Sequence, residues 1–138
     1  MNIKDEQAML AAGTALSEQL KPGMLVFLIG DLGAGKTTFV RGVLRGLGHS
    51  GAVKSPTYNI VEPYEINGTA VFHFDLYRLH DAEELEYMGI RDYINESAIC
   101  FIEWPDRGEG LLPAADLQIY IKIHQSERDL QIFPSIDL

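Results

Sequence analysis

A glycine-rich segment, "GDLGAGKT" at residues 30–37, contains the residue types that bind phosphate. It fits the pattern G-x-x-x-x-G-K-[ST], the phosphate-binding loop or P-loop. Glycines permit the backbone angles that turn successive N–H groups toward one anion. The ammonium group of Lys36 can reach the β and γ phosphates of a nucleotide, and the hydroxyl of Thr37 can bind Mg²⁺. The alternative is a strand-to-helix turn that binds no ligand.

Two carboxylates follow apolar runs and are candidates for the metal site. Glu103 ends "AICFIE" and Asp75 ends "VFHFD". In a parallel sheet, ligands bind beyond the carboxyl ends of the strands, so both side chains are expected beside the nucleotide. We place Glu103 on the metal and Asp75 on a water molecule or the metal's water shell, and the two roles could be reversed. Either residue could instead be a solvated acid just past a strand.

The segment "KSPTY" at residues 54–58 is typical of a loop that senses the γ-phosphate. Thr57 offers a hydroxyl to phosphate or Mg²⁺, and Lys54 offers a positive charge. The alternative is a proline-led entry into a strand.

Two residues with aromatic rings lie within two positions of the candidate carboxylates. Trp104 follows Glu103 directly and could brace the site or cap the core. His73 lies in "FHFDLYR", and a lone histidine between aromatic residues is more often a packed core residue than a base.

The elements that must position these residues follow from apolar spacing and turn residues. An α-helix is expected over 5–20, a strand covered on both faces over 24–29, and a second helix over 37–48. Asn67-Gly68 predicts a β-hairpin, a short acidic helix is expected over 81–89, and another buried strand over 98–104. A second hairpin is expected around Gln125-Ser126. The pattern predicts one α/β domain over 1–138, a P-loop NTPase-like three-layer sandwich whose mixed sheet has a parallel core and antiparallel hairpin additions.

The composition limits the classes of partner. The chain has 20 acidic and 11 basic residues and a net charge of −9, which disfavours direct binding to nucleic acid. The charge is uneven: residues 36–78 contain five bases and three acids, and residues 81–109 contain two bases and nine acids. One region could therefore bind an anion and the other a cationic partner, although an acidic stretch can also be only a solvated face.

The same composition predicts a cytoplasmic protein with no membrane segment. No apolar run approaches the ~18 residues of a membrane span, and the N-terminal segment lacks the layout of a signal peptide. Cys100 is the only cysteine and lies in an apolar run, so it is expected to be an inert core residue.

The sequence also limits which nucleotide and which class of reaction are expected. The N/T-K-x-D element of GTP-specific switches is absent from the sequence, so ATP is the expected nucleotide. No lid-sized insertion and no acceptor domain are predicted, which favours an ATPase that acts on a partner. The alternatives are a small-molecule kinase and a nucleotide-gated binding module with negligible hydrolysis.

Taken together, these motifs resemble the bacterial TsaE (YjeE) family, the ATPase component of tRNA threonylcarbamoyladenosine biosynthesis. The resemblance extends from about Asp5 to Pro113 and rests on the order and spacing of five segments. They are "GDLGAGKTTFVRG", "VKSPTY", "HFDLYRL", "EELEYMGIRDY" and "EWPDR".

The resemblance implies weak ATP hydrolysis by the chain alone, with ATP or ADP and Mg²⁺ as cofactors. It implies work with TsaB and with TsaD, the transferase that modifies adenosine 37 of tRNAs reading ANN codons, so that tRNA is reached only through the complex. It assigns the phosphates to Gly33, Ala34, Gly35, Lys36, Thr37 and Thr38, and Mg²⁺ to Thr37 and Glu103.

The resemblance also implies that Thr57 is switch-like and that Asp75 and Trp104 belong to the catalytic site with Lys36. It suggests Glu6 and Arg128 for the base pocket. Many members have threonine where Met9 stands here, so a hydroxyl contact at that position is not expected.

Overall fold

The computed structural model describes residues 1–56 and 58–138. The described residues form seven strands, which are β1 Asn2–Ile3, β2 Leu25–Ile29, β3 Val61–Ile66, β4 Thr69–Asp75, β5 Ala98–Glu103, β6 Leu117–His124 and β7 Glu127–Phe133. Their helices are α1 Glu6–Ser17, α2 Lys36–Leu47, α3 Glu83–Tyr87 and α4 Ile90–Tyr93, with a 3₁₀ turn η1 at Pro105–Gly108.

All seven strands join one sheet in the order β1-β7-β6-β2-β5-β4-β3. The four central strands β6, β2, β5 and β4 are parallel to one another. The outer strands β3, β7 and β1 pair antiparallel at the two edges. The predicted mixed sheet, with a parallel core and hairpin additions, is confirmed.

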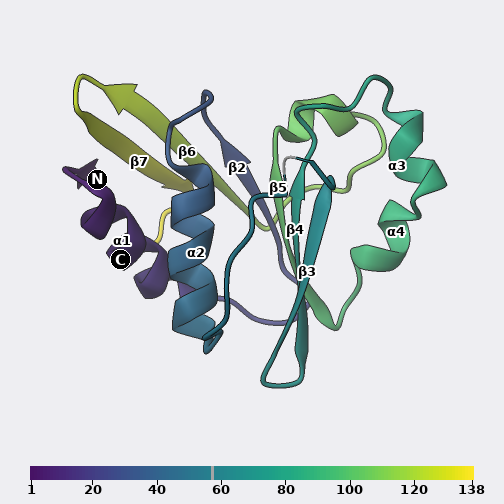
Figure 1. Cartoon of the computed structure of the whole chain (residues 1–138), viewed down its shortest axis with the longest axis horizontal. Coiled ribbons are helices and arrows are strands. Elements are labelled where there is room, and N and C mark those ends of the chain that lie inside the picture. Colours follow the sequence, from purple (N-terminus) through teal and green to yellow (C-terminus); the bar gives the residue numbers. More distant parts are fainter. Residues whose placement is uncertain (57) are drawn as a thin grey trace.

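Helices cover both faces of the sheet (Figure 1), with α1 and α2 on one side and α3 and α4 on the other. Side chains alternate along β2 accordingly: Val26 and Leu28 pack in the core under α1 and α2, and Leu25 packs in the core on the opposite face. The predicted three-layer arrangement is therefore correct.

The apolar run of β5 reflects its central position. All six of its residues are buried, because the strand has neighbours on both edges and side chains on both faces. Burial raises the pKa of the Cys100 thiol to about 12, so the thiol stays protonated at neutral pH. This is the inert core cysteine that the sequence predicted.

The first helix begins where a carboxylate can cap it. The Asp5 side chain accepts a hydrogen bond from the Ala8 amide at 2.9 Å, which satisfies one of the unpaired N–H groups of the first turn. Its buried face packs closely on α2, and the Thr14 hydroxyl donates to the Gly42 carbonyl at 3.1 Å. None of the helices in the described part of the chain is long and apolar enough to cross a membrane.

Short elements of the fold differ from the sequence expectation. The first hairpin turns at Asn67-Gly68 as predicted, and its strand β3 begins at Val61, directly after Ile60, which has a left-handed φ of 66°. The two-residue strand β1 and the four-residue helix α4 were not predicted. Both are too short to carry a recognisable periodicity, and β1 exists only through its pairing with β7.

The close approach of α1 and α2 predicts a large effect of one added methyl group. A Cβ at Gly42 would lie 2.3 Å from the Leu10 carbonyl oxygen, so Gly42→Ala should separate the helices. We expect the free energy of unfolding to fall by about 1–3 kcal/mol. Urea denaturation checks this, with Gly51→Ala as control because its added Cβ meets only the ring of His49. Equal stabilities of the two variants would contradict the packing.

Candidate functional site

The P-loop adopts a shape that depends on its glycines. Gly35 has a φ of 107° and directly precedes α2, which begins at Lys36. The first intrahelical bond is donated by the Phe39 amide to the Gly35 carbonyl at 2.9 Å. The amides of the first three residues of α2 therefore lie before the helical ladder and can bind an anion at the helix N-terminus.

The Lys36 side chain is enclosed at this loop. Only 5% of the residue is exposed. Its ammonium group donates to the Gly30 carbonyl and lies 4.1 Å from the centre of the Trp104 ring. Burial lowers the pKa of Lys36, and the nearby carboxylates of Glu103 and Asp75 offset part of that decrease. A negatively charged phosphate would stabilise the charged form further.

Two strand-end carboxylates face this lysine. Asp75 and Glu103 are register partners at the ends of β4 and β5, and their exposed fractions are 7% and 3%. The Thr37 hydroxyl lies 3.3 Å from Glu103 Oε2. Asp75 Oδ1 accepts a hydrogen bond from the Tyr77 amide at 3.0 Å. Two acids from separate segments and the first turn of α2 thus meet at one edge of the sheet.

Trp104 connects the lysine to the segment after β4. It has a left-handed backbone with a φ of 57°, and its ring packs against Tyr77 with centroids 4.9 Å apart. A left-handed conformation is costly for a non-glycine residue and is kept where the surroundings enforce it. Here it directs the indole ring over the Lys36 ammonium.

Most of the residues predicted to bind phosphate or metal line one cleft of about 300 Å³. Its described lining contains Leu32, Gly33, Gly35, Lys36, Thr37, Thr38, Asp75, Glu103 and Trp104. Leu32, which the sequence analysis did not select, is 59% exposed. Thr57 lies outside the described residues, so its predicted role is untested.

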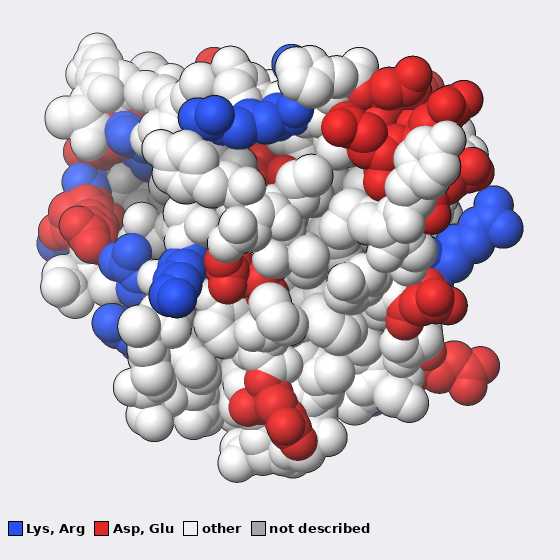
Figure 2. All heavy atoms as spheres, turned by 45° about the vertical axis from the view of Figure 1, so that its right-hand side comes forward, with Lys and Arg blue, Asp and Glu red and all other residues white. Residues whose placement is uncertain are grey.

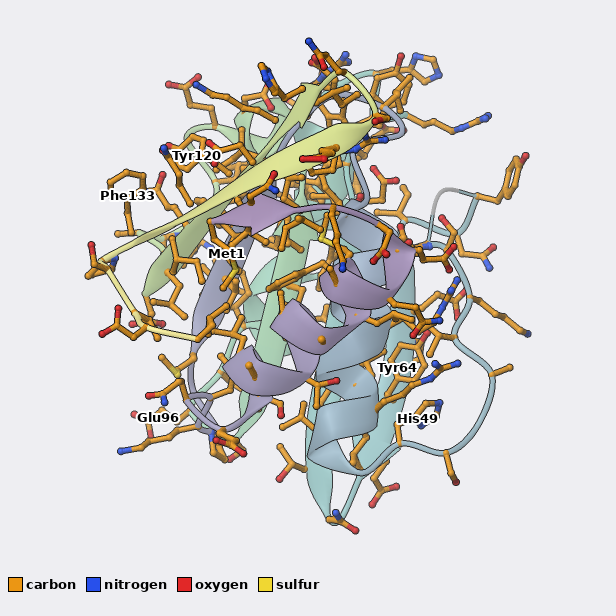
Figure 3. The ribbon with its side chains drawn as sticks, turned by 90° about the vertical axis from the view of Figure 1, so that its left-hand side faces the viewer. Met1, His49, Tyr64, Glu96, Tyr120 and Phe133 are labelled. Carbon is orange, nitrogen blue, oxygen red and sulfur yellow. The ribbon has the colours of Figure 1, made fainter. Side chains whose placement is uncertain are left out.

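The rest of the segment at 54–58 does not join this lining in the described structure. The Tyr64 hydroxyl lies 3.2 Å from the Lys54 amide and accepts its hydrogen bond. The ring of His49 meets the ring of Tyr64 edge-on at 5.0 Å (Figure 3). The loop that leaves α2 is therefore attached to β3 at the first residue of the predicted segment 54–58.

A second pocket of about 200 Å³ adjoins the cleft through Gly33, Gly35 and Thr38. Glu6, Ala34 and Arg128 line it, so the two residues suggested for a base pocket lie together beside the P-loop. Its other lining residues are Ile3, Asp5, Met9 and Ser126. Ile3, Asp5 and Ser126 were not expected at a site from the sequence, and Met9 was noted only as a departure from the threonine common in the resembling family. Asp5 caps α1, and an acid at the start of a helical pattern is the local signal that the sequence offers for it.

Arg128 contacts the loop directly. Its Nε donates to the Ala34 carbonyl at 3.1 Å and its Nη2 to the Gly33 carbonyl at 3.3 Å. The second hairpin thereby supports the backbone of the P-loop across 94 residues of sequence. The guanidinium group suits this task because its donors are held in one plane.

The donor set fits Mg²⁺ that is shared with a phosphate. Thr37 supplies a hydroxyl, and Glu103 and Asp75 supply carboxylates, which are hard oxygen ligands. Among the described residues, no cluster of three or more histidine, cysteine, aspartate or glutamate side chains could hold a metal alone. Mg²⁺ usually takes its remaining ligands from water and substrate phosphates, which agrees with this sparse set.

The acidic surface region lies over α3, and no residue of that helix is among the described lining of the cleft. Figure 2 shows carboxylates gathered over α3, where Glu83, Glu84 and Glu86 follow one another within one short helix. Glu83 and Glu86 are exposed. The uneven charge that the sequence showed is thus present as an acidic surface region.

The chain is similar in sequence to proteins of one known family. Residues 3–130 match the family described as Threonylcarbamoyl adenosine biosynthesis protein TsaE. The tRNA threonylcarbamoyladenosine biosynthesis protein TsaE of Haemophilus influenzae is 50% identical over 141 residues, covering 99% of this chain and 89% of that protein. The protein of the same name from Bacillus subtilis is 43% identical over 102 residues, covering 74% of this chain and 63% of that protein.

A solved structure supports the fold assignment. The crystal structure of Bacillus subtilis YdiB superimposes with a TM-score of 0.79 at 31% sequence identity, covering 94% of this chain and 80% of that chain. The P-loop NTPase-like architecture predicted from the sequence is confirmed.

The lowered pKa of Lys36 predicts a pH-dependent stability. In the unfolded chain Lys36 keeps its ordinary pKa of 10.5, so near that pH the unfolded state binds more protons than the folded state. The free energy of unfolding of the wild type, relative to Lys36→Met, should therefore rise as the pH increases toward 10.5. At pH values below the pKa that Lys36 has in the folded chain, the lysine is charged in both states, and the full free-energy cost of burying that charge remains.

Urea denaturation of the two proteins without nucleotide, at a series of pH values, measures this difference. The matched control is Lys122→Met, because Lys122 is exposed on β6. A difference between wild type and Lys36→Met that stays constant or falls with pH would contradict the burial effect.

Proposed function

The chain belongs to the TsaE family of threonylcarbamoyl adenosine biosynthesis proteins, and from this premise we propose that it is a Mg²⁺-dependent ATPase. We propose that it binds the TsaB–TsaD complex and supports threonylcarbamoylation of adenosine 37 in tRNAs that read ANN codons. ATP and ADP are its proposed nucleotides, and the cytoplasm is its proposed location.

One observation carries this proposal. Lys36, Thr37, Asp75 and Glu103 come from three segments and line one cleft at the carboxyl ends of parallel strands. A P-loop alone would support nucleotide binding. The added pair of buried carboxylates supports hydrolysis, because phosphoryl transfer needs a metal site and a group that orients the attacking water.

Each residue then has a distinct task. The first amides of α2 and the Lys36 ammonium bind the phosphates, and the lysine stabilises the charge that develops between the β and γ positions. Thr37 and Glu103 would hold Mg²⁺, which would neutralise negative charge on the phosphate oxygens. Asp75 orients the attacking water, and Trp104 packs over the lysine and limits the access of bulk water to it.

The adjacent pocket is the proposed site of the adenine base. Glu6 and Met9 on α1 and Arg128 on β7 surround it, and it opens to the cleft at Gly33 and Gly35. A nucleotide could therefore place its base beside α1 while its phosphates lie on the N-terminus of α2.

The partner dependence follows from size and charge. The seven-stranded sheet and its helices use most of the described chain, and no acceptor domain remains among the described residues. The net charge of −9 disfavours direct tRNA binding. We therefore propose that a separate protein holds the tRNA and that TsaB–TsaD is this partner.

Steady-state hydrolysis tests the reaction. We expect Mg²⁺-dependent release of inorganic phosphate from ATP by the chain, with a rate changed by purified TsaB–TsaD. Lys36→Ala should lower the rate by about 100-fold or more, because it removes a donor to the developing charge. An unchanged rate with no complex formation would refute the partner role, and label transferred from ATP to a metabolite would indicate a kinase instead.

Substitutions of the two carboxylates should have different effects on Mg²⁺-dependent nucleotide affinity and on turnover. Glu103→Gln should remove most of the gain in ADP affinity that Mg²⁺ provides, since the amide is a poor Mg²⁺ ligand. Asp75→Asn should keep that gain and reduce turnover by about 10²–10⁴-fold.

Calorimetric ADP titrations with Mg²⁺ and with EDTA, together with turnover measurements, distinguish the two effects. Glu109→Gln on the exposed segment after η1 is the control. If Asp75→Asn lost the Mg²⁺ gain and Glu103→Gln kept it, the two assignments would have to be exchanged.

A further inference from the structure

A buried histidine stands directly behind the proposed metal ligand. His73 is 0% exposed, and its Nε2 lies 2.5 Å from Glu103 Oε2. A carboxylate that is to bind a metal can only accept a hydrogen bond, so we assign the donor to the imidazole Nε2–H. The roles proposed above do not include this residue.

The sheet register explains why the two side chains meet. Val71, His73 and Asp75 alternate onto one face of β4, and Val71 packs in the core that lies under α2. In the parallel neighbour β5, the register partner of His73 is Phe101, and Glu103 follows two residues later on the same face. His73 therefore reaches Glu103 diagonally from inside the core.

Packing alone does not account for a histidine at this position. In the described structure its Nδ1 is a buried nitrogen with no hydrogen-bond partner. Burying a polar atom without a partner lowers stability, and an apolar side chain would avoid that cost. The bond from Nε2 to Glu103 is the one polar contact that the described structure records for the ring.

The same carboxylate oxygen also meets the P-loop helix. The Thr37 hydroxyl lies 3.3 Å from Glu103 Oε2, the atom to which His73 donates. The terminal torsion of a glutamate is broad, so a carboxylate without fixed partners samples many orientations. A donor on its core side restricts that rotation while the cleft side stays available.

We propose that His73 is a positioning residue whose Nε2–H holds the Glu103 carboxylate in the orientation that meets Thr37 and thereby sets the strength of Mg²⁺ binding. The inference rests on the proposed Mg²⁺ site. Partners behind a metal ligand commonly change metal affinity by about 10–100-fold when they are removed. His73 acts through Glu103 and contacts no phosphate in this scheme.

Two amide variants test the bond itself. His73→Gln places its side-chain N–H₂ the same number of bonds from Cα as Nε2, so it can still donate to Glu103. His73→Asn places its N–H₂ at the position of Nδ1 and leaves Glu103 without the donor. Both variants bury one amide, so they are matched in polarity.

The measurement is the ratio of ADP dissociation constants in EDTA and in Mg²⁺. We expect His73→Gln to retain most of the wild-type ratio and His73→Asn to lose about tenfold or more of it. ADP affinity in EDTA should stay within about twofold for both variants. Equal ratios for the two variants, or an equal loss of affinity in EDTA, would overturn the proposal, because either result indicates a structural role only.

A measurement on the wild-type chain covers the case in which a variant does not fold. In ¹⁵N-histidine-labelled protein bound to ADP, the Nε2–H resonance of His73 should shift on addition of Mg²⁺. A resonance that does not move would overturn the coupling. If wild-type ADP affinity did not depend on Mg²⁺ at all, the proposed metal site would fail first, and this result is distinct from a failure of His73 alone.

Discussion

The parallel register of β4 and β5 is the constraint on which the rest of the site depends. It sets Asp75 opposite Glu103 at the end of two buried strands. The neighbouring strand β2 leads into the P-loop, so the lysine and hydroxyl of α2 arrive at the same edge of the sheet. A shift of one residue in that register would turn the carboxylate of one strand toward the opposite face.

This arrangement concentrates buried polar groups at one edge of an otherwise apolar interior. Lys36, His73, Asp75 and Glu103 are four of the five buried polar residues in the described chain. The mutual attraction of Lys36 and the acids offsets only part of the cost of burial, as the lowered pKa of the lysine shows. The fold therefore tolerates a locally unfavourable cluster, and the apolar cores on both faces of the sheet compensate for it.

In the proposed function, this buried polar cluster binds the nucleotide phosphates and the metal. Enclosed charges act more strongly on a phosphate than exposed ones, because water screens them less. The acidic region over α3 lies on a different part of the surface, where it suits contact with a protein rather than with tRNA. In this view the chain contains the site that binds and hydrolyses the nucleotide, and the reaction on tRNA belongs to its partners.

Consecutive residues are enough to predict the longer helices and strands and the phosphate loop. The apolar runs at 24–29 and 98–104, the helical spacing after Lys36, and the turn at Asn67-Gly68 are properties of consecutive residues, and the structure confirms each of them. The strand-end positions of Asp75 and Glu103 were also readable, because each ends an apolar run. Glu6 and Arg128 have no local sequence pattern that marks them, and only the resemblance to the TsaE family suggested them. The match to the family model confirms that resemblance.

The contacts between residues far apart in the sequence became visible only in the folded chain. That Arg128 bonds the carbonyls of Gly33 and Ala34, and that Met9 lines the same pocket, depends on the order of strands in the sheet. The pairing of His73 with Glu103 depends on the register of β4 and β5, and a sequence pattern showed only a histidine between aromatic residues. Apolar periodicity and turn residues depend on neighbours along the chain. The hydrogen bonds of His73 and Arg128, in contrast, join residues 30 to 95 positions apart.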